Sequence, residues 1–163
     1  TTSIRERAFY GCRALMSVAI PSSVVSVGKS AFSGCNELTR VDILDLGNWC
    51  EIEFGSFDAN PLYYAKRLYL NGELVRGLEV PERVRGVGSY VFYDYDCLTS
   101  VTMSSSVANI GSGAFVFRHY GNEAPVPVEL DYLCFTAEEA DCTISMKVSR
   151  SAPSVSLEYS SFI

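Results

Sequence analysis

Apolar residues return along this chain in a fixed order, with a spacing of 23 residues. The first set is Phe9, Cys12, Leu15, Val18, Ile20 and Val27, and the second begins with Phe32, Cys35, Leu38, Val41 and Ile43. After an interruption the order resumes with Val80, Val84, Val87, Phe92, Leu98, Val101 and Met103, followed by Val107, Ile110 and Phe115. A fixed period of this length is typical of a repeat solenoid, in which each unit packs only on its neighbours.

A single unit predicts one short strand and a return path. Residues 18–20 place an outward Ala between two β-branched residues, and Pro21 then ends the strand because it lacks an N–H for the ladder. Val27 is expected to point inward from a turn, and Phe32 to pack the far side of the unit. Such strands are too short to be stable alone, so we expect parallel pairing with the strands of neighbouring units.

The interruption predicts a longer, atypical unit at about residues 44–77. Asp45 is expected to cap a short helical turn that carries Trp49. Strand-sized alternations fall at 52–54 and 68–70. Asn71-Gly72 then predicts a two-residue β-hairpin, because both positions favour positive φ.

These motifs resemble a known family. Residues 20–43 read I-P-S-S-V-V-S-V-G-K-S-A-F-S-G-C-N-E-L-T-R-V-D-I, which is similar to the BspA-type leucine-rich repeats of bacterial cell-surface proteins. The resemblance covers roughly residues 3–117 and includes the longer unit. It implies a right-handed, mainly β solenoid of short parallel strands, turns and short helical segments, in proteins that are exported and implicated in adhesion. One departure is Tyr95, which stands where the units carry Cys, with Cys97 displaced by two.

The last part of the chain follows a different pattern. Apolar residues alternate with polar or smaller ones at 126–134, at 142–148 and at 155–159. We therefore predict a repeat domain over residues 1–117 and three half-buried strands within 118–163. This tail is either a β-rich C-terminal cap, since a solenoid must cover its last open unit, or the opening of another β domain.

The chain contains six cysteines. Cys12 and Cys35 lie one period apart and are expected to stack in adjacent units as free, buried thiols. Cys134 and Cys142 are the candidate disulfide, because they lie on matching faces of consecutive predicted strands. A structural zinc site is not expected, since no C-x-x-C occurs and His119 is the one histidine.

Composition and charge argue against two classes of function, nucleic-acid binding and membrane insertion. The net charge is −6 without a basic stripe, which argues against nucleic-acid binding. No run of about 18 uncharged apolar residues exists, so membrane insertion within this chain is not expected. No leader-like segment opens the chain, and we expect it to be a piece of a longer protein whose targeting signal lies elsewhere.

Residues able to carry catalysis are few, and their pattern is unspecific. His119 is expected to be an ordinary loop residue. The acidic groups Asp94 and Asp96, and Glu138, Glu139 and Asp141, are expected to be solvated loop charges rather than paired catalytic carboxylates. We therefore predict no catalytic residues, no cofactor and no metal site.

Outward side chains remain as candidates for partner binding. The outward strand positions should form ladders across one exposed sheet face, and Glu53 is a further candidate member. The middle of the chain is also rich in tyrosine, which is enriched at binding hot spots, although Tyr93 and Tyr95 are expected to line the core. The candidate partner-binding residues are Arg40, Asp42, Tyr69, Glu79, Thr102, Tyr63, Tyr64 and Tyr90.

The resulting hypothesis is a non-enzymatic protein- or glycan-binding module. The resemblance implies that it belongs to an exported bacterial surface protein that acts in adhesion or host interaction. The alternative is an accessory or spacer domain of a larger secreted enzyme, such as a glycan- or peptide-acting hydrolase. In both cases the chain is expected to lie at the cell surface or outside the cell.

Overall fold

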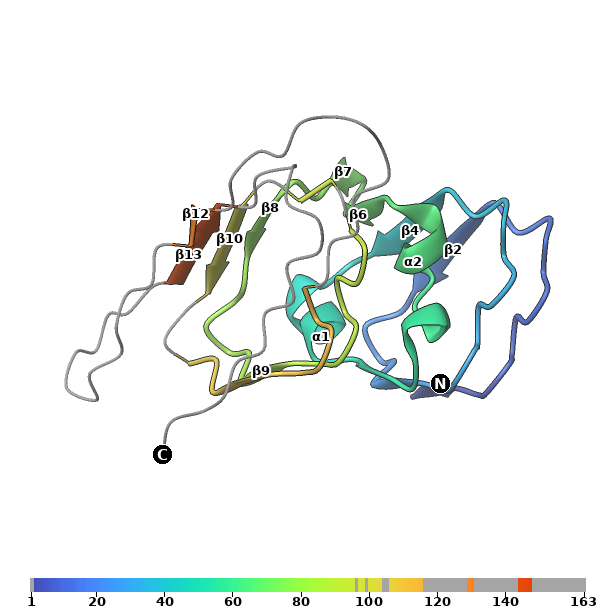
Figure 1. Ribbon diagram of the computed structural model, residues 1–163, viewed down its shortest axis with the longest axis horizontal. Helices are drawn as coiled ribbons and strands as arrows, with labels where there is room; N and C mark the ends of the chain where they lie inside the picture. Colours follow the sequence, from blue (N-terminus) through green and yellow to red (C-terminus); the bar gives the residue numbers. More distant parts are fainter. Residues whose placement is uncertain are drawn as a thin grey trace.

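The computed structural model contains two rows of short strands (Figure 1). It describes residues 2–95, 97–98, 100–103 and 106–115, together with strand segments at 129–130 and 144–147. The upper row of the view comprises β2 (Ser17–Ile20), β4 (Arg40–Ile43), β6 (Leu68–Leu70), β7 (Glu73–Leu74), β8 (Gly77–Glu79), β10 (Ser100–Met103), β12 (Glu129–Leu130) and β13 (Ile144–Lys147). The second row comprises β1 (Ser3–Ile4), β3 (Ser26–Val27), β5 (Glu53–Phe54), β9 (Gly86–Val87) and β11 (Asn109–Ile110).

Parallel pairing in the upper row follows the repeat. Val18 lies opposite Val41, and Val41 opposite Leu68. After the interruption, Leu78 lies opposite Val101 at the same spacing of 23 residues. The predicted parallel stacking of the unit strands is therefore confirmed, and the longer unit keeps the register.

The second row of strands was not predicted. Val27 lies on β3, where it pairs with Ile4 on one side and with Phe54 on the other, and it is 1% exposed. The expectation that Val27 lies in a turn is therefore wrong, because the residue is on a strand. The expectation that its side chain is buried is correct. Two-residue strands carry no alternation of their own, so the sequence pattern could not distinguish them from turns.

The expectation of one continuous strand face is also wrong. β6 turns back through Asn71 (φ 51°) and Gly72 (φ 89°) into β7, so the predicted hairpin is confirmed. Because β7 pairs antiparallel with the free edge of β6, the sheet β2-β4-β6-β7 ends there. β8 begins a second sheet of order β12-β13-β10-β8.

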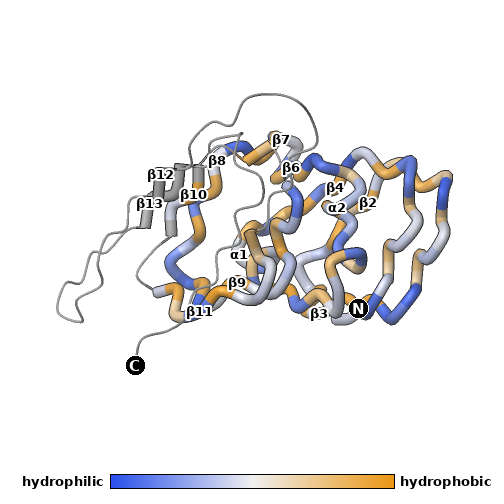
Figure 2. Tube along the Cα trace, viewed as in Figure 1, coloured by the Kyte–Doolittle hydropathy of each residue, from blue (hydrophilic) through white to orange (hydrophobic). Residues whose placement is uncertain are grey.

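Aromatic side chains stack between neighbouring units in the core. The rings of Phe9 and Phe32 lie 4.9 Å apart at 9°, and those of Phe92 and Phe115 lie 5.3 Å apart at 13°. Residues one period apart therefore form columns, as the repeat predicts. Figure 2 shows hydrophobic and hydrophilic positions alternating along the chain in both rows, and the buried apolar residues of the core come from both rows.

The two first cysteines behave differently from each other. Cys35 is fully buried and its thiol donates to the carbonyl oxygen of Phe9 at 3.2 Å, whereas Cys12 is exposed. The expectation of buried thiols is correct for Cys35 and wrong for Cys12. Within the described residues, the unit that carries Cys12 is covered by a neighbouring unit on one side, while Cys35 lies between two.

Short helical segments complete the longer unit. They are α1 (Leu46–Cys50), the 3-10 helix η1 (Phe57–Ala59) and α2 (Leu62–Ala65). Asp45 caps α1 by accepting a hydrogen bond from the Asn48 amide at 3.0 Å, as predicted. Arg83 of a later unit donates to Asp45 and to Asn48, which ties α1 to the next repeat.

Two tail segments pair with the upper row. β13 runs antiparallel to β10, with Met146 opposite Val101, and β12 runs antiparallel to β13. They fall within the first two of the three predicted tail strands, and the third, at 155–159, lies outside the described residues. The candidate disulfide Cys134–Cys142 also lies outside them. The boundary at 117 and the role of the tail stay predictions.

Candidate functional site

Three predicted residues form one cluster on the outward side of β4 and β6. Asp42 and Tyr69 are direct neighbours across the two strands. The Arg40 guanidinium donates two hydrogen bonds to the Asp42 carboxylate, at 2.7 Å and 2.6 Å, and lies 3.9 Å from the centre of the Tyr69 ring. A bidentate ion pair stacked on an aromatic ring holds the long Arg side chain in one orientation.

The cluster is charged and accessible. The hydrogen bond to Asp42 raises the pKa of Arg40 above its ordinary value, and the same bond holds the pKa of Asp42 below its ordinary value. The exposed fractions are 42% for the Arg40 side chain and 34% for that of Asp42. Both groups therefore stay ionised at neutral pH while retaining open hydrogen-bonding surface.

The cluster continues over β2, where the outward side chains are small. Ser17 and Ala19 on β2 are exposed, and Ala19 lies directly opposite Asp42. The surface formed by Ser17, Ala19, Arg40, Asp42 and Tyr69 is called the strand face below. Of the side chains that alternate with these, Val41 and Leu68 are fully buried, whereas Val18 at the outer strand is partly buried. The strand face is thus a rigid surface supported by the core.

Glu79 and Thr102 lie next to each other, but they are not part of the strand face. They lie opposite one another on β8 and β10, in the second sheet, and Glu79 is exposed while Thr102 is half-buried. Glu53 lies on β5 in the second row of strands, where it pairs with Ser26. The expectation that Glu53 joins the ladder of outward strand residues is wrong, because Glu53 and Phe54 continue the row of β3 rather than that of β4.

The remaining candidate tyrosines gather in a second place, around α2. We call the group Phe57, Tyr63, Tyr64, Tyr90 and Tyr93 the aromatic cluster. Its neighbouring rings lie 4.9 to 6.0 Å apart. Lys66 lies 4.8 Å from the centre of the Tyr63 ring. Phe57 was not predicted, since a single Phe in a loop carries no signal.

Some rings of the aromatic cluster have a structural role. The Tyr64 hydroxyl accepts a hydrogen bond from the Gly34 amide at 3.2 Å. Tyr93 is 7% exposed and Tyr95 is fully buried, which confirms that these two line the core. Phe57, at 38%, is the most exposed ring of the cluster. The cluster is therefore a mixed structural and surface feature, less accessible than the strand face.

The acidic candidates do not form a catalytic pair. Asp94 is 3% exposed and forms an ion pair with Lys66, so the expectation of a solvated loop charge is wrong for this residue. Asp96, His119 and the acidic residues at 138–141 lie outside the described residues. Within the described part of the chain, no group of three His, Cys, Asp or Glu side chains could hold a metal ion. No helix in that part is long and apolar enough to cross a membrane.

Comparison with solved structures finds a likeness to the crystal structure of the T. pallidum leucine-rich repeat protein. The two chains are 26% identical, and their TM-score is 0.36. The match covers 71% of this chain and 47% of the other, so this chain spans about half the length of that protein. Comparison with curated proteins finds no match.

The sequence profile of one family matches most of the chain. It is described as the BspA type leucine rich repeat region, and it matches in six copies over residues 1–63 and 65–133. Leucine-rich repeats are in general non-catalytic modules that bind other proteins. The stacked unit strands, the aromatic columns and this profile lead to one conclusion: the chain belongs to the BspA-type leucine-rich repeat family.

Proposed function

We propose that this chain is a non-enzymatic binding module of an exported bacterial surface protein, and that the strand face contacts the partner. The observation that carries the proposal is the Arg40–Asp42–Tyr69 cluster, which is ordered, charged and accessible. Arg and Tyr are enriched among the residues that dominate protein interfaces. A side chain already held in place also loses less conformational entropy on binding.

The partner that the strand face suits best is a protein at a cell surface or in the extracellular matrix. The strand face, with small residues on β2 and a charged pair beside an aromatic ring, offers hydrogen bonds to an opposing polar surface. Export and a role in adhesion rest on the family, which is typical of bacterial surface proteins. A right-handed solenoid form, with the tail as its cap, belongs to the same proposal.

A double variant tests the role of the strand face. Arg40→Ala with Tyr69→Ala is expected to weaken attachment of the chain to matrix proteins or to target cells by about tenfold or more. The matched control is Arg7→Ala with Tyr10→Ala, because Arg7 lies 5.6 Å from the centre of the exposed Tyr10 ring in a turn outside the strand face. Equal attachment by both double variants and the unmodified chain would contradict the proposal.

The non-enzymatic part has its own test. The chain is incubated with panels of glycans and peptides, and products are measured by mass spectrometry. We expect no turnover. Product formation that scales with the concentration of the chain would contradict this part of the proposal, and would favour hydrolysis by the chain itself.

A further inference from the structure

Cys12 and Cys35 lie at equivalent positions in the first two units, and both bond to the same oxygen atom. The carbonyl oxygen of Phe9 accepts a hydrogen bond from the Cys12 amide at 3.1 Å and another from the Cys35 thiol at 3.2 Å. Because both donors converge on one atom, the Cys35 sulfur lies beside the backbone of Cys12. Both residues carry thiols in this structure. They form a pair rather than two isolated side chains.

The backbones of the two units run close together just before these cysteines. The Gly11 amide donates to the Ser33 carbonyl oxygen at 2.7 Å, and a Cβ atom built on Gly34 would lie 3.3 Å from the Gly11 Cα. Each of these glycines immediately precedes one cysteine. A disulfide joins Cα atoms about 4.4–6.8 Å apart, and backbones in van der Waals contact bring equivalent residues into that range. The pair can therefore be bridged without moving either unit.

The two thiols differ in their access to solvent. Cys12 is exposed, whereas Cys35 is fully buried. Burial raises the pKa of Cys35, a charge on Cys12 raises it as well, and the Cys12 backbone N–H lowers it. A reagent in solution therefore reaches Cys12 first, while Cys35 stays protonated and protected until a reacting group is formed beside it.

We infer that Cys12 and Cys35 are a dithiol site that a small-molecule disulfide, such as oxidised glutathione, converts into a disulfide bond. The Cys12 thiol loses its proton to water and attacks one glutathione sulfur, so that a mixed disulfide forms and one glutathione thiolate leaves. The Cys35 thiol then gives its proton to that thiolate, and its sulfur attacks the Cys12 sulfur. The second glutathione leaves and takes up the proton released first. The two protein thiols are thereby oxidised, and the glutathione disulfide is reduced to two thiols.

The fold can accept this bond at little cost. The proton that Cys35 gives up is the one that it donates to Phe9, but the Phe9 carbonyl oxygen keeps the Cys12 amide as a donor. The exposed Cys12 side chain can turn toward Cys35 by a change of rotamer. Neither cysteine belongs to the strand face. The inference therefore goes beyond the proposed binding function and does not depend on it.

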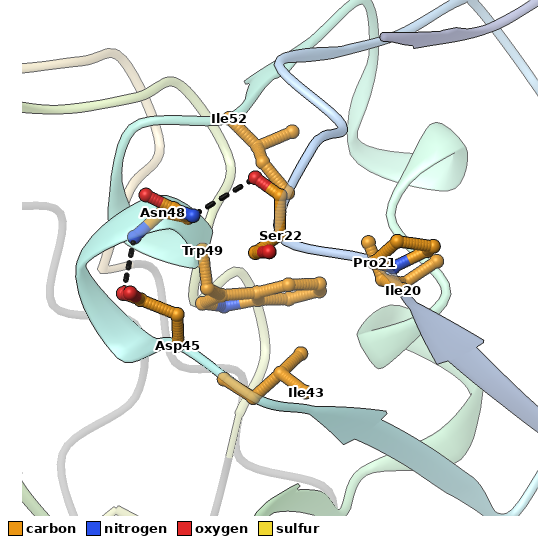
Figure 3. A pocket seen from close by; sticks show the side chains of 8 residues that line it. All are labelled: Ile20, Pro21, Ser22, Ile43, Asp45, Asn48, Trp49 and Ile52. Carbon is orange, nitrogen blue, oxygen red and sulfur yellow. Dashed lines mark hydrogen bonds between the residues drawn. The ribbon is translucent and has the colours of Figure 1, made fainter. Parts of the chain in front are cut away.

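The disulfide would strengthen a connection whose side-chain hydrogen bonds are weak. The Cys35 thiol is a weak donor, and the Thr39 hydroxyl donates to the Met16 carbonyl oxygen at 3.2 Å. By comparison, Asn48 on α1 ties the longer unit to Ser22, to whose carbonyl oxygen it donates at 2.8 Å (Figure 3). A covalent bond would give the first unit a firmer attachment than either kind of hydrogen bond.

Reaction with oxidised glutathione tests the inference. The full chain carries Cys134→Ser and Cys142→Ser, which removes the candidate disulfide of the tail, and is incubated with oxidised glutathione at about pH 8. We expect the intact mass to fall by two hydrogens, and mass spectrometry of peptides to show Cys12 joined to Cys35. No reaction, a lasting glutathione adduct on Cys12, or Cys12 joined to another cysteine would each overturn the inference.

Single variants in the same background separate the two roles. Cys35→Ser lacks the second thiol, so its reaction should stop at a glutathione adduct on Cys12. Cys12→Ser should leave Cys35 unmodified in the native state, because the buried thiol is not accessible. Cys50→Ser is the matched control, since Cys50 is also fully buried but lies in the longer unit, and it should close like its parent. Closure by Cys35→Ser, or its loss in a folded Cys50→Ser variant, would overturn the inference.

Denaturant shows what the native geometry contributes. The folded chain holds the two thiols side by side, whereas the unfolded chain brings them together only by chance. The equilibrium constant for closure with glutathione should therefore be about tenfold or more larger in the native state than in urea. Equal constants under the two conditions would show that the fold does not bring the pair together, and would overturn the inference.

Discussion

Neighbouring units are joined in two different ways in this molecule. Between the first two units the backbone makes the connection: the Phe9 amide donates to the Ala31 carbonyl at 2.8 Å, and the Gly11 amide donates to Ser33 at 2.7 Å. The same pattern recurs later, where the Phe92 amide donates to Ala114 at 2.8 Å. We call these the regular junctions.

Where the longer unit meets the next one, a backbone bond from the Gly88 amide to the Cys50 carbonyl is joined by several side-chain contacts. The Asn60 amide group donates to the carbonyl oxygens of Tyr90 and Val91 at 2.8 Å and 2.9 Å, and its own oxygen accepts from the Leu62 amide at 2.8 Å. Lys66 donates to Asp94 nearby. We call this the long junction.

The difference shows what unequal repeat length requires. At a regular junction every residue type except Pro supplies the same backbone donors and acceptors, so only the buried side chains are constrained. At the long junction the carbonyl groups of Tyr90 and Val91 accept hydrogen bonds from one particular side chain. The regular junctions should therefore depend on shape and volume, and the long junction on residue identity.

The largest effect is expected at a regular junction, in the aromatic column. Phe32→Ala should lower the free energy of unfolding by about 3–5 kcal/mol, because Phe32 is fully buried between neighbouring units. Phe9→Ala should have a smaller effect, since Phe9 is only partly buried. Urea denaturation measures both. Equal effects would show that burial does not differ between the first two units.

The next effect should appear at the long junction. Asn60→Ala removes the side-chain partner of the buried Val91 carbonyl and of the Leu62 amide, while the Tyr90 carbonyl keeps the Tyr93 amide as a donor. It should lower the free energy of unfolding by about 2–4 kcal/mol. Asn36→Ala is the control, because Asn36 is exposed in a turn. It should change the same quantity by less than about 0.5 kcal/mol. A tolerated Asn60→Ala change would remove the distinction between the junctions.

The ion pair at the long junction gives an intermediate effect. Lys66→Met keeps the aliphatic stem but removes the ammonium group that is paired with the Asp94 carboxylate, which is 4% exposed. We expect a loss of about 1–3 kcal/mol in the free energy of unfolding, against little change for Lys29→Met at an exposed position. Thermal unfolding of the two variants, compared at one pH, measures the difference.

The smallest effect on stability near neutral pH is expected from the cysteines, whose difference appears instead in their reactivity. Burial raises the pKa of Cys50, in the longer unit, to about 12, whereas Cys12 at the first regular junction is exposed. At pH 8 a maleimide should label Cys12 and leave Cys50 unlabelled in the native state, as mass spectrometry of peptides would show. Labelling of Cys50 as fast as in denaturant would contradict the structure.

The same shift gives a pH dependence of known sign. The folded state holds the Cys50 proton more tightly than the unfolded state, whose thiol has the ordinary pKa of 9.0. The stability that the protonated Cys50 thiol contributes is fully present below pH 9. The free energy of unfolding therefore falls as the pH rises from 9 toward about 12. Urea denaturation of the Cys50→Ala variant at several pH values in this range measures the effect. The free energy of unfolding of this variant should fall less between pH 9 and about 12 than that of the unmodified chain.

Features with their own local signal could be predicted from the sequence. The 23-residue period gave the phenylalanine columns, Asn71-Gly72 gave the hairpin, and Asp45 gave the helix cap. In each case either a repeated apolar position or a conformational preference of one or two residues determines the structure.

Features that depend on three-dimensional partners could not be predicted. Asn60 resembles any polar loop residue until the Tyr90 and Val91 carbonyls face it. Arg40, Asp42 and Tyr69 were correctly expected on one face, but their stacking depends on the register between β4 and β6. Asn71-Gly72 predicts that β7 pairs with β6, but not that β7 takes the edge of β6 opposite β4, and this choice ends the first sheet.

The hairpin of β6 and β7 has a mechanical consequence. Because it closes the first sheet, a stretching force along the stack is carried from one sheet to the next by the Gly88–Cys50 backbone bond and by side chains such as Asn60 and Lys66. A row of ladder hydrogen bonds shares such a load, whereas single contacts break in turn. Under tension the seam beside the hairpin should yield first, and single-molecule extension should record an early rupture there.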